Sequence, residues 1–364
     1  MPRLTLLRMD SGFLSSDACV AAIRGRPLPL DSSAYVHRPP QNSAFDSLEA
    51  ECAAAIATPG ALVRIKGARQ TGKTSLVLGL ARQAQQLDYA TGVCDLQALV
   101  ATEREPDLDA FLYSFCRQIT QVLGLPDQLD DYWDDLFGSA IGCKSYFEEY
   151  LLPTLERPLL LTLDDIDSLF PFPQLADEFF GLLRAWHEEA KTRDLWKRLR
   201  LVVAHATEVY LPLNLNKSPF NVGVPVELPP FEAREVDHLA QIYGLSLPAD
   251  DSQLLNKLLG GWPHLIHVAL HQMVANQLSP MALAESVTTQ PGPFATALGH
   301  VAEIIVANPL LAEAMVKVLT SDRPVEIAAP QALKLQSLGI ARRYNQAIAC
   351  SCSLYRTHLL SLAT

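Results

Sequence analysis

Residues 67–74 read Gly67-Ala68-Arg69-Gln70-Thr71-Gly72-Lys73-Thr74 and fit the pattern G-x-x-x-x-G-K-[ST] at every fixed position. Residues 62–66, just before this stretch, alternate apolar and basic side chains as a strand does. Residues 75–83, just after it, carry leucine and alanine with no helix breaker other than Gly79. Because strand, glycine loop and helix form the context in which this motif binds phosphate, the stretch predicts a nucleoside-triphosphate site.

The residue types of the loop indicate what each would do there. Gly67 and Gly72 let the backbone turn tightly, so that successive N–H groups point at the β-phosphate. The Lys73 ammonium is expected to reach the β- and γ-phosphate oxygens, and the Thr74 hydroxyl to bind Mg²⁺. The alternative, a glycine loop that merely turns the chain, is disfavoured by the complete motif.

A second informative stretch is the near-continuous apolar run of residues 159–165, LLLTLDD, which ends in two acids. Such a run predicts a buried parallel strand whose carboxyl end faces the phosphates. Asp164 is then expected to hold Mg²⁺ through water, and Asp165 to orient or deprotonate the attacking water. Asp167 is expected to be an acid at the start of a helix.

Two further strands are expected, over residues 200–208 and 224–228. The first should lie beside the acid-tipped strand, so that Thr207 or His205 at its end could sense the γ-phosphate. For His205 the alternative is a buried structural histidine. Pro225 in the second strand suits a strand start or an edge position.

Composition limits the class of protein. The chain has 364 residues and a formal net charge of −11, which disfavours a protein that coats nucleic acid non-specifically. No apolar run approaches the roughly 20 residues of a membrane span, and the start MPRLTLLRMDSG is too quickly polar for a secretory signal. The seven scattered cysteines suit reduced thiols, without the ligand spacing of a zinc site. We therefore expect a cytoplasmic protein.

The pattern along the chain predicts four regions. Residues 1–42 form an N-terminal extension with a proline-punctuated segment that could lie over an adenine, although an ordinary linker fits equally well. Residues 43–230 form a P-loop core that begins with a helix over 43–57 capped by Ser43. Residues 231–290 form a helical lid, and residues 291–364 form a domain of three helices and a hairpin over 339–354, the pattern of a winged helix. A joint is expected at 290–300.

These landmarks together resemble the AAA-like ATPase family common in cyanobacteria, itself similar to archaeal-type and STAND signalling ATPases. The resemblance runs from about Pro27 to the end of the chain and includes GALVRIKGARQTGKTSL, WKRLRLVVAHATEVY and GGWPHL. It implies an α/β fold: a P-loop NTPase parallel sheet with helices on both faces, followed by a helical lid and a C-terminal winged-helix domain. It also implies ATP and Mg²⁺ as the ligands.

The resemblance assigns roles residue by residue. Thr207 becomes the strand-end sensor, and Asp164 and Asp165 the magnesium and water-directing acids. Arg38 and Pro263 are expected to flank the base. The phosphates would be bound by Gly67, Ala68, Arg69, Gln70, Thr71, Gly72, Lys73, Thr74 and Ser75.

This chain departs from its relatives at one informative position. Relatives commonly carry Asp-Glu where this chain has Asp164-Asp165. A carboxylate one methylene shorter would reach the water poorly, so slow hydrolysis is expected. Slow hydrolysis suits a switch better than a motor.

Three functions remain open at this point. The first is a nucleotide-controlled switch in signalling or regulated assembly, as a homo-oligomer or with a separate sensor or effector protein, because no receptor module is visible on this chain. An arginine acting in trans would be expected at a subunit interface. The second is a DNA-transaction ATPase, which is not favoured because the C-terminal region holds only six basic against four acidic residues. The third is a nucleotide-binding scaffold without turnover. Candidates for the trans arginine are Arg184, Arg193, Arg198 and Arg200.

Overall fold

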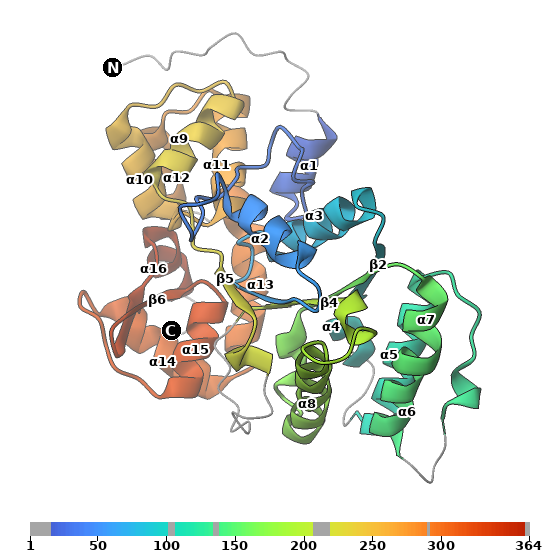
Figure 1. Ribbon diagram of the computed structural model, residues 1–364. Helices are drawn as coiled ribbons and strands as arrows, with labels where there is room; N and C mark the ends of the chain where they lie inside the picture. The colour runs from blue at the N-terminus through green and yellow to red at the C-terminus, as the bar shows by residue number, and fades with distance from the viewer. Residues whose placement is uncertain (1–15, 101–105, 134–137, 207–218, 290–291, 361–364) are drawn as a thin grey trace. The chain divides into compact units, whose positions relative to one another are not determined.

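The computed structural model describes residues 16–100, 106–133, 138–206, 219–289 and 292–360 (Figure 1). The chain divides into two compact units, and each is described by itself. The first unit contains Met1–Val36, Gly67–Gly72 and Leu228–Thr364, and the second contains His37–Lys66 and Lys73–Glu227.

The second unit is built on a five-stranded sheet with the order β2-β3-β4-β1-β5. Every neighbouring pair of strands is parallel. Strands β4, β3 and β2 lie on one side of β1, and β5 lies on the other, so the strand order reverses at β1. Ligands of such open sheets bind outside the carboxyl ends of the strands near the point of reversal. The strands are β1 (Leu62–Lys66), β2 (Ala90–Asp95), β3 (Leu159–Asp164), β4 (Leu199–His205) and β5 (Val224–Glu227).

The expected position of the strand at 200–208 beside the acid-tipped strand is confirmed, since β4 pairs with β3. All residues of β3 and β4 are buried, so both faces of the sheet are covered, as in other parallel sheets. Pro225 lies in β5 at the edge of the sheet, where its missing N–H costs no ladder bond. The covering helices are α2 (Leu48–Ala57), α3 (Lys73–Gln86), α4 (Leu96–Val100), α5 (Leu108–Val122), α6 (Ser139–Ser145), α7 (Leu152–Leu155) and α8 (Pro173–Glu189).

The predicted start of the first core helix is wrong. Helix α2 begins at Leu48, and the Ser47 hydroxyl, not that of Ser43, accepts the capping bond from the Ala50 N–H at 3.1 Å. The Glu51 carboxylate accepts the N–H groups of residues 41 and 42 at 2.9 and 3.1 Å. These bonds hold residues 41 and 42 in a turn ahead of the helix. The turn prevents the helix from starting at Ser43, and composition alone does not reveal it.

The helical stretch before β3 is not one regular α-helix. It begins as α6 and passes through a π-helical segment, Tyr146–Leu151, into α7. Tyr146 and Phe147 of this segment are fully buried in the aromatic core of the unit. Short 3₁₀ turns complete the unit at Leu129–Asp131, Ile166–Leu169, Trp196–Arg198 and Pro219–Asn221.

The described part of the first unit is mostly helical and shares one apolar core. Helix α1 packs against α11, and α9 to α12 gather into one bundle (Figure 1). The C-terminal helices are followed by the antiparallel hairpin β6–β7, an order compatible with a winged helix. The elements are α1 (Asp17–Ile23), α9 (Ala233–Ile242), α10 (Ala249–Leu259), α11 (Pro263–Asn276), α12 (Pro280–Thr289), α13 (Ala295–Val306), α14 (Pro309–Thr320), α15 (Ala329–Ser337), β6 (Ala341–Tyr344), β7 (Ala347–Cys350) and α16 (Ser353–Leu359).

Two features of this unit were not predicted. The joint predicted at 290–300 contains a 3₁₀ turn, Gly292–Phe294, and the start of α13, because Phe294 is fully buried and anchors the segment in the core. The final helix, α16, was not expected, and it buries Leu354, Tyr355 and Leu359. Within the described residues, none of the helices combines the length and the apolar character that a membrane crossing requires.

Candidate nucleotide-binding site

The first turn of the glycine loop is held by its own hydrogen bond. The Thr71 hydroxyl donates to the Ala68 carbonyl at 2.8 Å, and Thr71 is fully buried. A Cβ atom at Gly67 would lie 2.7 Å from Thr71 Oγ1 and 3.1 Å from the Leu228 carbonyl, so only glycine fits there. Gly72 has φ +99°, a backbone conformation that side chains disfavour. The two fixed glycines of the motif are therefore required for different reasons: Gly67 because a Cβ atom has no room, and Gly72 because of its backbone conformation.

One N–H group of the loop is bonded within the first unit. The Arg69 N–H donates to the carbonyl of Ser337 at 2.8 Å. Ser337 is buried and is the last residue of α15. The backbone of the phosphate loop and the carboxyl end of α15 are thus directly coupled.

Within the second unit, the beginning of helix α3 and the tip of β3 are joined by hydrogen bonds. Helix α3 starts at Lys73, whose side chain is buried. The Thr74 hydroxyl donates to Asp164 Oδ2 at 2.7 Å, and the Asp165 N–H donates to Asp164 Oδ1 at 3.0 Å. Asp164 is only 6% exposed, so its carboxylate is fixed in orientation by these two bonds.

The oxygens of Thr74 and Asp164 suit a magnesium ion. Both are hard ligands, and the hydrogen bond between them places them together. Among the described residues there is no cluster of three or more His, Cys, Asp or Glu side chains for a metal. Magnesium usually binds to one or two protein groups and completes its shell with water and phosphate oxygens, so the two residues fit it.

Asp165 occupies an unusual position at the end of β3. Its φ of +50° places it in the left-handed region, which aspartate tolerates better than most residues. Partial burial raises the pKa of its carboxyl group, the neighbouring Asp164 charge raises it further, and Lys73 opposes both. A carboxylate with a raised pKa is a better proton acceptor than an ordinary surface aspartate.

Asp167 has a partner that the sequence did not reveal. It lies in the first turn of the 3₁₀ segment after β3, as expected for an acid at a helix start. Its Oδ1 also accepts the Ala206 N–H at 3.0 Å, just beyond the end of β4. Asp167 therefore ties the ends of two neighbouring strands together. The closely spaced acids of DDID at 164–167 were the only signal of this role.

The other predicted residues have varied structural positions. Thr207 lies outside the described residues. His205 is buried at the end of β4, with its ring centroid 5.1 Å from that of Phe220, a packing position. Arg38 is buried in the second unit, and its N–H donates to the Glu49 carboxylate at 3.2 Å. Pro263 is the first residue of α11 in the first unit.

The four candidate trans arginines differ in accessibility. Arg200 is 5% exposed, donates to the carbonyls of residues 197 and 198, and lies over the Tyr89 ring, so it is a structural residue of β4. Arg193 pairs with Glu148 and Glu189. Arg184 lies 2.9 Å from Glu188, and Arg198 is half-buried.

The parallel sheet, the glycine loop between β1 and α3 and the acids at the tip of β3 define a P-loop NTPase fold. The chain belongs to the AAA-like domain family, whose model matches residues 23–361.

Other proteins resemble parts or most of the chain. A WD repeat-containing protein of Synechocystis sp. is 27% identical over 212 residues, which are 54% of this chain and 17% of that protein. The chain therefore spans about a sixth of this relative. The fold is similar to a Walker-type ATPase of Pyrococcus abyssi, with a TM-score of 0.57 and 11% identity over 91% of this chain and 99% of the other. It is also similar to the ORC2 protein of Aeropyrum pernix in its ADPNP–ADP complexes, with a TM-score of 0.53 and 16% identity over 90% and 94% of the two chains.

Proposed function

We propose that the protein is a magnesium-dependent, ATP-binding molecular switch that hydrolyses ATP slowly. The observation that carries the proposal is the hydrogen-bonded set of Thr74, Asp164 and Asp165 beside Lys73. ATP rather than GTP is favoured by membership of the AAA-like family. The solved ORC2 relative in its ADPNP–ADP complexes is consistent with an adenine nucleotide.

The roles of the residues follow from their chemistry. Residues 67–75 would cradle the phosphates with backbone N–H groups, and Lys73 would neutralise charge on the β- and γ-phosphates. Thr74 and Asp164 would hold Mg²⁺, which offsets the charge that develops on the phosphate oxygens. Asp165 would accept a proton from, or orient, the attacking water. Thr207, as strand-end sensor, and Arg38 and Pro263, beside the base, complete the proposed site.

Slow turnover is supported by the geometry of Asp165. The side chain is one methylene shorter than the glutamate that relatives commonly carry, and the left-handed backbone at this residue fixes its direction. A general base contributes about 10²–10⁴-fold when well placed, so a short reach leaves much of that factor unused.

A switch also needs a part of the protein that responds to the phosphates. The bond from the Arg69 N–H to the Ser337 carbonyl links the loop to α15 of the proposed winged helix, residues 291–364. Phosphate binding that reshapes the loop would change this link, and the two conformations would then differ in affinity for ATP. Helices α9 to α12 are the proposed lid. A homo-oligomer or a separate sensor or effector protein would receive the signal.

The test is the solution mass of the purified protein with Mg²⁺–ATP, with Mg²⁺–ADP and without nucleotide, measured together with phosphate release. We expect assembly that depends on ATP and turnover that is slow. Nucleotide binding with no change of mass or conformation in any state would contradict the switch, and it would support a nucleotide-binding scaffold or a partner-activated ATPase. Absence of ATP binding would contradict the whole proposal.

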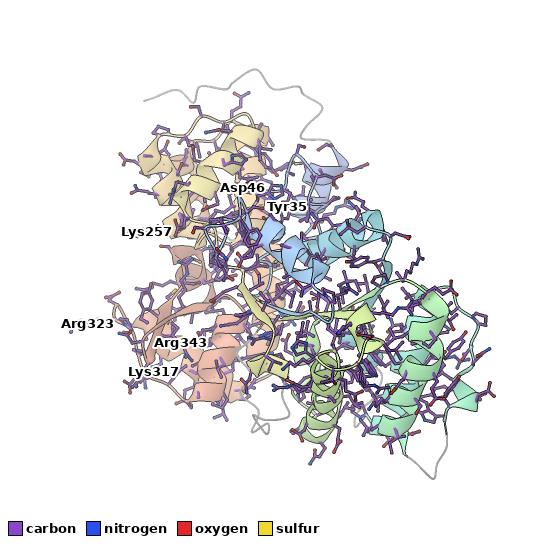
Figure 2. All side chains as sticks on the ribbon, viewed as in Figure 1. Tyr35, Asp46, Lys257, Lys317, Arg323 and Arg343 are labelled. Carbon is purple, nitrogen blue, oxygen red and sulfur yellow. The ribbon has the colours of Figure 1, made fainter. Side chains whose placement is uncertain are left out.

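One observation favours the second candidate, a DNA-transaction ATPase. Lys317 on α14, Arg323 in the loop after α14 and Arg343 on β6 are exposed (Figure 2). Tyr344, next to Arg343 on β6, is 52% exposed. Basic and aromatic side chains on a hairpin can contact a duplex. Binding to duplex DNA that weakens steeply with salt, and that is lost in Arg343→Gln, would favour this function over the switch.

A further inference from the structure

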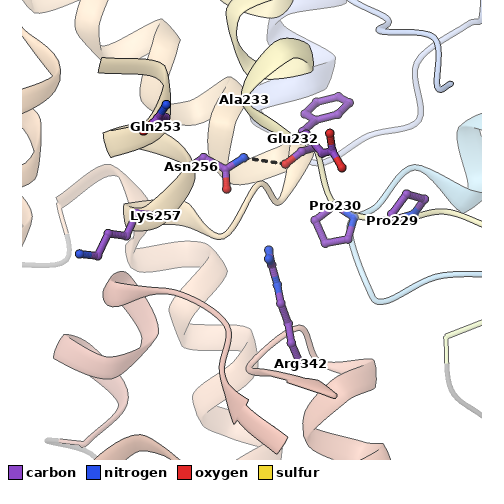
Figure 3. Close-up of a pocket in the computed structure, with 9 residues that line it drawn as sticks. Pro229, Pro230, Glu232, Ala233, Gln253, Asn256, Lys257 and Arg342 are labelled. Atoms are coloured by element: carbon purple, nitrogen blue, oxygen red, sulfur yellow. Dashed lines mark hydrogen bonds between the residues drawn. The ribbon is translucent and has the colours of Figure 1, made fainter. Parts of the chain in front are cut away.

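The first unit contains a cavity of about 470 Å³ that belongs to neither the phosphate loop nor the acidic pair. Three segments form it: the link that follows β5, helix α10 and strand β6 (Figure 3). Cavities of this volume are in the range that holds small organic molecules. Its lining residues are Pro229, Pro230, Phe231, Glu232, Ala233, Gln253, Asn256, Lys257 and Arg342.

Arg342 is the fixed cation of this cavity. Its Nη2 donates to the Gly260 carbonyl, and its guanidinium carbon lies 5.6 Å from the centroid of the Trp262 ring, a cation–π distance. Its Nε is buried and has no hydrogen-bond partner among the described residues. In Figure 3 the side chain reaches from β6 toward α10. The bond to Gly260 uses one of the five N–H groups of the guanidinium, so the terminal nitrogens of this fixed side chain have further N–H groups that can bind an anion.

Lys257 is the adjustable cation. It is exposed on α10, and no carboxylate of the described residues lies within ion-pair distance of it. The lining contains one acid, Glu232, whose carboxylate lies 3.9 Å from the Arg234 guanidinium outside the cavity. The lining thus carries two cations against one carboxylate that already has a cationic neighbour. The local electrostatic potential favours a negatively charged ligand.

The remaining lining residues suit the apolar part of a small organic ligand. Pro229, Pro230 and Ala233 supply apolar surface. Asn256 is held by a bond from its amide to the Phe231 carbonyl at 2.7 Å, which fixes its direction (Figure 3). Apolar walls with a few convergent polar groups are the usual composition of a small-ligand site.

We propose that this cavity binds a small organic anion, with a phosphate or carboxylate group held between Lys257 and Arg342 and an apolar body against Pro229 and Pro230. Such a ligand contacts the link, α10 and β6 together. It therefore stabilises the arrangement in which these three segments meet, by mass action on the state that binds it. The proposal does not depend on ATP hydrolysis.

A purely structural role for Arg342 is the main alternative. Its bond to Gly260 and its stacking on Trp262 would then account for it completely, and Lys257 would be an ordinary surface lysine. The anion-site hypothesis and the purely structural alternative predict different effects of neutralising Lys257. A surface lysine can be neutralised without effect on any ligand, whereas an anion-binding lysine cannot.

The test uses the full chain with Lys73→Ala, so that the phosphate loop does not contribute to binding. Phenyl phosphate and benzoate are titrated calorimetrically as probes, with benzyl alcohol as the neutral analogue. We expect saturable binding of at least one anion and none of the alcohol. Lys257→Gln should lower the affinity for the anion by about tenfold, the equivalent of one charge-assisted hydrogen bond. Whichever probe binds more tightly identifies the head group as phosphate or carboxylate.

Arg26→Gln is the control, because Arg26 is an exposed cation of the first unit that does not line the cavity. Its affinity for the probes should equal that of the parent protein. Arg342→Gln should abolish binding, and its melting temperature separates that effect from unfolding. The proposal is overturned if neither anion saturates, if the alcohol binds as well, or if Lys257→Gln and Arg26→Gln behave alike. Binding of an acidic peptide without binding of either small anion would also overturn it.

Discussion

The nucleotide site and the anion cavity differ in how their residues are spread along the chain. The phosphate loop is one continuous stretch, and Asp164, the proposed magnesium ligand, ends a single strand, so each part can be recognised in the sequence. The cavity draws on residues 229–233, 253–257 and 342, none of which forms a motif. A site built from fixed backbone geometry leaves a pattern in the sequence, whereas a site built by packing of separate segments does not.

The largest expected effect concerns the loop. Lys73→Ala should lower ATP affinity by about 100-fold, because it removes the charged donor to the phosphates. Calorimetric titration with Mg²⁺–ATP measures it. Lys66→Ala is the matched control, since Lys66 lies at the end of β1 and pairs with Glu227 at 3.7 Å. Unchanged ATP affinity in Lys73→Ala would contradict the assignment of the phosphate loop as the nucleotide site.

The next effect concerns the water-directing acid. Asp165→Asn should leave ATP affinity within about twofold and lower turnover by about 10²-fold, because an amide cannot accept the proton. Steady-state phosphate release with saturating Mg²⁺–ATP measures the turnover. Persistent turnover would mean that another carboxylate directs the water.

The same substitution should raise stability at neutral pH, since it removes a charge that burial and Asp164 disfavour. The pKa of Asp165 is raised on folding, so the folded state binds more protons and wild-type stability falls as pH rises through that raised value. The gain in Asp165→Asn should therefore grow with pH and vanish below about pH 4. Urea unfolding at a series of pH values measures it. A gain that is the same at all pH values would contradict the raised pKa.

The smallest effect concerns Asp167. Asp167→Ala should cost about 1–2 kcal/mol of stability, because the buried Ala206 N–H loses its acceptor. Asp167→Asn keeps an acceptor oxygen and should recover most of that loss. Glu178→Gln on the exposed surface of α8 is the control. If the alanine and asparagine variants are equally stable, the bond between the two strand ends contributes nothing.

Much of the second unit could be predicted because its signals are local. The strand at Leu62–Lys66 was predicted with its observed bounds, since a P-loop must follow a strand. The caps and ends of helices were harder to predict from the sequence. Ser43 and Ser47 are equivalent as local N-cap signals, and only the turn held by Glu51 decides between them. Phe294 likewise orders a segment that composition predicts to be a joint.

The sequence alone determined the P-loop, the acidic strand end and the α/β class, because glycine geometry, charge and apolar runs act over a few residues. The tertiary structure decided which acceptor holds the Arg69 N–H, which strand end Asp167 supports and where Arg342 meets an open cavity. Those contacts join residues far apart in the chain. Their energies depend on distances that exist only after the segments have packed, so no local pattern records them.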